Sequence, residues 1–125
     1  MTTPAAPRIA LCPSAALQER ALAVPFDVVY DGQTMRAFAI RFEGRAHAYL
    51  NRCTHLALEL DYWPNRIFDE SGQLLLCAVH RASYAPDTGQ CTGGPGRGPL
   101  VKIDTSEENG HVYWHPGGPI QPLEF

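Results

Sequence analysis

The sequence predicts an all-β domain, on three observations. Eleven prolines and eleven glycines occur in only 125 residues, and such a content favours turns over helices. The pair Asp31-Gly32 is a strong signal for a tight hairpin, and Glu43-Gly44 is expected to turn the chain again. Between these pairs, the side chains of residues 34–42 alternate in the way that lines the two faces of a strand.

The predicted elements follow in order along the chain. Residues 9–13 are expected to form a short strand, and residues 14–18 a brief helical turn with Ser14 as its cap. The further predicted strands cover residues 24–30, 34–42, 46–51, 73–76, 100–103 and 111–114, with a turn at 107–110 in the last hairpin. Residues 115–119 are expected to be irregular.

Composition limits the function classes. The chain is long enough for one domain, residues 1–125, with its own core; 45% of its residues are hydrophobic and 18% are charged. A net charge of −3 argues against nucleic-acid binding. No apolar run is long enough to cross a membrane, and the N-terminus shows no signal-peptide pattern. With no evident disulfide pairing, a cytoplasmic location is expected.

Two short motifs are the candidate site. Cys53-x-His55 and Cys77-x-x-His80 are separated by the 21 residues 56–76, and each begins just after a predicted strand. Two thiolates and two imidazoles suit either zinc or an iron–sulfur cluster. In the common zinc finger, however, the two cysteines lie together and the two histidines lie together further on. Here each motif has one of each, which favours a cluster with two cysteines on one iron and two histidines on the other.

This arrangement resembles the Rieske family, and the likeness extends over roughly residues 20–114. The resemblance implies a Rieske-type 2Fe–2S cofactor held by Cys53, His55, Cys77 and His80. It also implies a fold of antiparallel sheets with a small barrel-like base, into which a cluster-binding subdomain of about residues 51–98 is inserted. In the family, a glycine- and proline-bearing loop covers the cluster, and residues 93–99 resemble it.

Departures from the respiratory Rieske subunits indicate which branch of the family the chain resembles. Those subunits carry a disulfide between the ligand loops, and Leu58 and Val79 occupy the matching positions here. They also have a serine two residues after the second histidine, where this chain has Ala82. Fewer hydrogen bonds to the cluster predict a potential nearer about −150 mV than about +300 mV. Cys91 is interpreted as a packed free thiol rather than a ligand.

The expected function is that of a soluble Rieske ferredoxin, a non-enzymatic one-electron carrier. Its partners would be a separate flavin reductase as donor and an oxygenase-type acceptor, since the chain shows neither a nucleotide-binding glycine motif nor a mononuclear-iron triad. The alternative is an accessory or redox-sensing subunit that regulates a partner. The counts of charged residues over 51–97 leave the sign of the docking face open.

Overall fold

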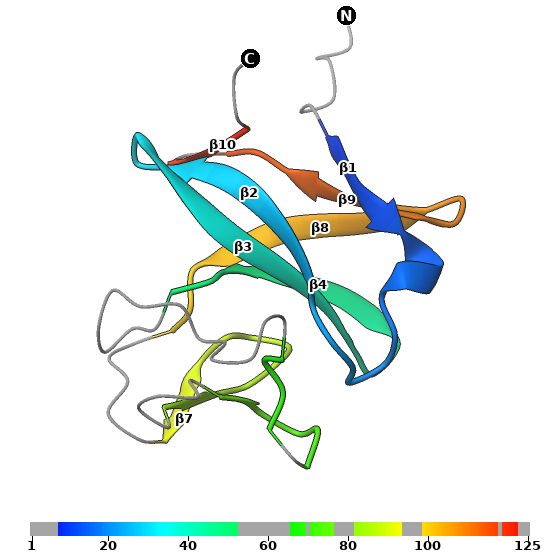
Figure 1. Ribbon diagram of the computed structural model, residues 1–125, viewed down its shortest axis with the longest axis vertical. Helices are drawn as coiled ribbons and strands as arrows, with labels where there is room; N and C mark the ends of the chain where they lie inside the picture. Colours follow the sequence, from blue (N-terminus) through cyan, green and yellow to red (C-terminus); the bar gives the residue numbers. More distant parts are fainter. Residues whose placement is uncertain are drawn as a thin grey trace, which may run out of the picture.

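The computed structural model describes residues 8–52, 66–69, 71–76, 82–93, 99–117 and 119–122. Ten strands and one turn of 3₁₀ helix make up its regular structure (Figure 1). In chain order they are β1 (Ile9–Pro13), η1 (Ser14–Ala16), β2 (Val24–Tyr30), β3 (Gln33–Phe42), β4 (Arg45–Leu50), β5 (Leu75–Leu76), β6 (Ser83–Tyr84), β7 (Cys91–Gly93), β8 (Lys102–Glu108), β9 (His111–His115) and β10 (Ile120–Gln121).

The strands form two antiparallel sheets. Seven of them, in the order β1-β9-β8-β4-β3-β2-β10, make one curled sheet that serves as the base. The other three, in the order β5-β6-β7, make a smaller sheet beneath it in Figure 1. No α-helix occurs in the described ranges, so the predicted all-β class is confirmed. All three strands of the smaller sheet fall between β4 and β8 in the chain, while the subdomain limits of 51–98 stay a prediction.

Three tight turns give the base its hairpins. The residue pairs Asp31-Gly32, Glu43-Gly44 and Asn109-Gly110 all have positive φ, from 49° to 83°. Positive φ at both central positions is the type I′ geometry, whose twist matches that of paired strands. The first two turns agree with the prediction. The third is shorter than the predicted turn at 107–110, because β8 continues to Glu108.

Two hydrophobic cores lie on opposite faces of the central strands. Ala37 and Ala39 of β3 belong to one core, which we call the base core. Phe38, Ile40 and Phe42 belong to the other, the junction core, which also contains residues of the smaller sheet. Strand β3 is therefore buried on both faces over residues 37–40. The alternation in the sequence sorts its larger side chains into the junction core and its alanines into the base core.

Three local predictions were wrong. Ser14 does not cap the first turn: Pro13 occupies the N-cap and no side chain caps the turn. The predicted strand 73–76 is regular only at Leu75–Leu76, because the N–H groups of the two preceding residues bond side chains instead of a neighbouring strand. The Gln73 N–H bonds Ser71 Oγ at 3.1 Å, and the Leu74 N–H bonds Asp69 Oδ1 at 3.4 Å. The segment 115–119 is not wholly irregular, since His115 ends β9 and Gly117 forms an isolated β-bridge with Ile120.

Candidate metal centre

The four predicted ligands, Cys53, His55, Cys77 and His80, lie outside the described residues, as do Leu58 and Val79. The structure does describe the segment that leads into the first motif and the segments on either side of the second. These segments are the end of β4 and the facing ends of β5 and β6. Their arrangement shows whether the fold brings the two motifs to one place.

Strand β4 leads into the first motif. Its last residue is held by a hydrogen bond from the Leu50 N–H to the Val101 carbonyl, at 2.9 Å. The Asn51 N–H then bonds the Arg36 carbonyl at 3.0 Å, and the Arg52 N–H bonds the Leu50 carbonyl at 2.9 Å. The last of these bonds spans only two residues, which is a γ-turn centred on Asn51. The chain therefore turns sharply two residues before Cys53.

The second motif lies between two paired strands. Leu75 is opposite Tyr84 and Leu76 is opposite Ser83, so the chain leaves β5 and enters β6 at the same edge of the smaller sheet. Gly93, the last residue of β7, is opposite Ser83 at that edge. The segment containing the second motif and the segment that follows Gly93 thus start from one edge. The latter returns at Leu100 and Val101, where the Val101 carbonyl holds the end of β4.

The junction core fixes these strand ends relative to one another. Leu75, Ala82 and Tyr84 are fully buried in it and lie directly before or shortly after the second motif. From the base, Tyr49 of β4 enters the same core, together with Leu100. Both ligand-bearing segments therefore start from a single packed core, and rigid strands of this kind can hold a site in a fixed geometry.

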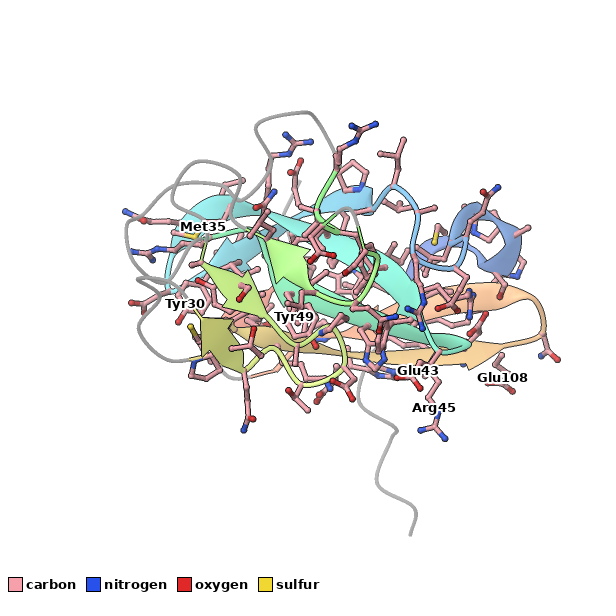
Figure 2. The ribbon with its side chains drawn as sticks, turned by 90° about the horizontal axis from the view of Figure 1, so that it is seen from below. Tyr30, Met35, Glu43, Arg45, Tyr49 and Glu108 are labelled. Atoms are coloured by element: carbon pink, nitrogen blue, oxygen red, sulfur yellow. The ribbon has the colours of Figure 1, made fainter. Side chains whose placement is uncertain are left out.

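Tyr49 connects the base to the smaller sheet through a polar contact as well. It lies near the centre of the view in Figure 2, fully buried, and its hydroxyl donates a hydrogen bond of 2.8 Å to the Pro86 carbonyl. Burial, together with the negative charge of Asp87, raises the pKa of Tyr49 and keeps the hydroxyl a neutral donor. Beside the ring, Gly89 has φ +76°, and a Cβ there would lie 2.7 Å from Tyr49 Cε1. Only glycine fits this contact.

The remaining cysteines and histidines have structural surroundings. Cys12 and Cys91 are free thiols; Cys12 packs against the base core and Cys91 against the junction core. His111 Nδ1 lies 3.3 Å from the Asn109 carbonyl, and His115 Nε2 lies 2.8 Å from Ser106 Oγ. In β4, burial lowers the pKa of His47, which agrees with its interpretation as a strand residue. The described ranges contain no cluster of three or more metal-binding side chains.

Asn51 lies close to the first motif in the sequence, and its burial was not predicted. It is 7% exposed and is the one buried polar side chain among the described residues. A buried carboxamide is costly unless it is hydrogen-bonded, so its position two residues before Cys53 points to a role in fixing the first motif segment. A polar residue two positions before a cysteine is the only signal in the sequence, and the burial of Asn51 depends on the tertiary fold.

The donor set fits a Rieske cluster in its chemistry, with two thiolates for one iron and two imidazoles for the other. The described strand ends also fit, because they start both motif segments from one core. None of the described helical structure is long and apolar enough to cross a bilayer.

Solved structures with the same fold include a ferredoxin, a ferredoxin–oxygenase complex and an oxygenase. The ferredoxin of carbazole 1,9a-dioxygenase from Nocardioides aromaticivorans IC177 superposes with a TM-score of 0.70 at 21% identity, covering 88% of this chain and 98% of that one. A ferredoxin–oxygenase complex of carbazole 1,9a-dioxygenase gives 0.67 at 20% identity, covering 94% and 97%. The terminal oxygenase from Novosphingobium sp. KA1 gives 0.70 at 24% identity, covering 94% of this chain but 31% of its own.

A comparison with curated protein sequences found no match. The family model described as the Rieske [2Fe-2S] domain matches residues 8–105. This span contains both Cys/His motifs and the strands β4, β5 and β6 that lie next to them in the chain. The cofactor of that family is the Rieske-type 2Fe–2S cluster expected from the motifs. The chain belongs to the Rieske [2Fe-2S] domain family.

Proposed function

We propose that this protein is a one-electron carrier of the Rieske ferredoxin class, which takes electrons from a separate flavin reductase and passes them to an oxygenase-type acceptor. The observation that carries the proposal is the family match over both motifs. The match covers 98% of the ferredoxin of carbazole 1,9a-dioxygenase but only 31% of the terminal oxygenase. The proposed location is the cytoplasm, consistent with free Cys12 and Cys91.

Cys53 and Cys77 would hold one iron, and His55 and His80 the other. When bound, such a cluster supplies a one-electron redox couple. Water would be excluded from the base of the ligand segments by three fully buried residues, Leu75, Ala82 and Tyr84. Ala82 offers no hydroxyl to the site, in keeping with a potential nearer about −150 mV than about +300 mV.

The test is the spectrum of the purified protein. We expect two irons and two inorganic sulfides per chain, and an EPR signal on reduction whose average g lies clearly below that of all-cysteine clusters. The variant His80→Cys should shift this signal, while Cys91→Ser, which changes a thiol of β7, should leave it unchanged. A single bound zinc, or an all-cysteine signal in the native protein, would overturn the proposal.

The carrier role requires a second measurement, because ligation alone does not separate it from regulation of a partner. A carrier is reduced by a flavin reductase and reoxidised by an oxygenase within turnover. Binding of one oxidation state to a partner without electron flow would instead indicate a redox-sensing subunit. A midpoint potential well above zero, measured by voltammetry, would contradict the low-potential class.

A further inference from the structure

Four described residues other than glycine have a left-handed backbone. Three of them, Asp31, Glu43 and Asn109, lie in the tight turns of the base. The fourth is Arg20, with a φ of 55°, in the segment between η1 and β2. A left-handed backbone is unfavourable for a residue with a side chain, and it persists only where the surrounding contacts hold it. The contacts of Arg20 therefore indicate what this conformation serves.

The backbone and the side chain of Arg20 are both fixed to the base. Its N–H bonds the Arg41 carbonyl of β3 at 2.9 Å. Its guanidinium lies 4.8 Å from the centre of the Phe42 ring, and Nε bonds the Glu19 carboxylate at 3.3 Å. That carboxylate accepts two further hydrogen bonds, of 2.7 and 2.8 Å, from N–H groups of the β3–β4 turn. The guanidinium is therefore held in one place and in one orientation.

From this position the guanidinium reaches the chain that leads into β5. The paired chain that ends in β5 forms a hairpin, which we call the β5 hairpin: residues 66–69 and 71–76. A hydrogen bond of 2.8 Å from the Leu76 N–H to the Ile67 carbonyl closes it. At its tip, the Gly72 carbonyl accepts a 3.2 Å hydrogen bond from Arg20 Nη1. The two residues also pack closely, because a Cβ at Gly72 would lie 3.3 Å from Arg20 Cδ.

The base holds two turns of the smaller sheet with different numbers of hydrogen bonds. Three bonds of 2.8 to 3.0 Å hold the turn between β6 and β7, with donors on Tyr49, Leu100 and Lys102. Among the described residues, the tip of the β5 hairpin receives one such bond from the base, that of Arg20. The rest of the hairpin meets the base in the apolar junction core. The position of the tip therefore depends on Arg20 alone among the described hydrogen-bond donors of the base.

The β5 hairpin ends at Leu76, one residue before Cys77. The hydrogen bonds that close the hairpin lie within it, so a restraint on its tip also restrains the end that leads into the second motif. We propose that Arg20 is a positioning residue for the second motif: by holding the tip of the β5 hairpin on the base, it fixes the segment that delivers Cys77. This inference rests on the proposed function, in which Cys77 is a cluster ligand.

The chain supplies a matched pair of variants. Arg20→Met keeps an unbranched stem beside Gly72 and removes the guanidinium. Lys102→Met is the control, since it also removes one positive charge and one hydrogen bond to a turn carbonyl of the smaller sheet. In that variant the β6–β7 turn keeps its hydrogen bonds from Tyr49 and Leu100 and should stay in place.

The first experiment measures amide hydrogen exchange by mass spectrometry, which needs no cluster. Because a hydrogen bond from a charged, partly buried donor is lost, Arg20→Met should speed exchange in peptides covering residues 66–76 at least about five-fold. Peptides covering residues 84–92 should change by less than about two-fold, and Lys102→Met should change both regions by less than about two-fold. Comparing the two regions separates local opening from a global loss of stability, which would speed both. Arg20→Lys, which keeps a cationic donor, should lie between Arg20→Met and the native protein.

The second experiment measures the loss of visible cluster absorbance under a chelator. Arg20→Met should lose this absorbance faster than Lys102→Met, by up to the factor that separates them in exchange. Equal exchange over residues 66–76 in the two variants, or equal cluster loss, would overturn the positioning role. A native protein without a 2Fe–2S cluster would overturn the carrier function instead, and the exchange experiment would still decide whether Arg20 holds the β5 hairpin.

Discussion

The hydrogen bond between Tyr49 and Pro86 is a buried side-chain contact that connects the base to the smaller sheet. The variant Tyr49→Phe removes the hydroxyl that donates to the Pro86 carbonyl at 2.8 Å and keeps the ring in the junction core. Both residues are buried, so the carbonyl is left without its donor. Such a loss costs about 2 kcal/mol, within a range of about 1–3 kcal/mol. For a domain of this size that lowers Tm by roughly 4–12 °C.

Urea unfolding of the protein and its variant gives the free energy directly. The control is Tyr113→Phe, because the Tyr113 ring lies under Arg8 at 4.1 Å while its hydroxyl has no hydrogen bond among the described residues. That change should cost less than about 0.5 kcal/mol. Since Tyr49 lies in the strand that leads into the first motif, Tyr49→Phe should also lose its cluster absorbance faster under a chelator. Equal free energies for the two variants would refute the reasoning.

Three further variants test the packing and charge pattern. Gly89→Ala should lower the free energy of unfolding in urea at least twice as much as Gly32→Ala. Both glycines have positive φ, which costs an alanine about 1 kcal/mol, but only the new Cβ at position 89 would clash with the buried Tyr49 ring. A hydrogen bond from the Arg41 guanidinium lowers the pKa of Glu107 below its ordinary value of 4.5. The pair therefore stabilises the folded state at pH values above 4.5, and this contribution is lost as the pH falls through the lowered pKa of the folded protein. Glu107→Gln should therefore be less stable than the native protein at pH 7, and a difference that persists unchanged at low pH would contradict the assignment. Asn51→Leu removes a buried carboxamide, leaves its hydrogen-bond partner unpaired and should lower the free energy of unfolding by about 1–3 kcal/mol. The cluster absorbance in the visible spectrum should also be lost faster, and an unchanged rate of loss would show that Asn51 does not support the first motif.

The cofactor and most of the base could be predicted from the sequence. The kind of cofactor that a set of ligands can bind depends on residue types and short spacings, which the sequence shows directly. Cys53-x-His55 and Cys77-x-x-His80 therefore indicated the family that the comparison then confirmed. The hairpin turns could also be predicted, because a pair such as Asp31-Gly32 favours the left-handed backbone of a tight turn independently of distant residues. Which residues ligate the cluster remains a prediction from these motifs.

Properties that depend on distant residues could not be predicted. Strand β10 contains two residues and exists only because β2 offers an edge. The burial of Asn51 and the contact of Gly89 with Tyr49 require the smaller sheet to pack on the base. Ion pairs between distant residues are of the same kind: Arg41 bonds Glu107 and Arg8 bonds Glu108, although the members of these pairs are 66 and 100 positions apart in the sequence. Local chemistry thus determined the cofactor, and three-dimensional packing decided which charges are paired, because Coulomb interactions depend on distance in space rather than on separation in sequence.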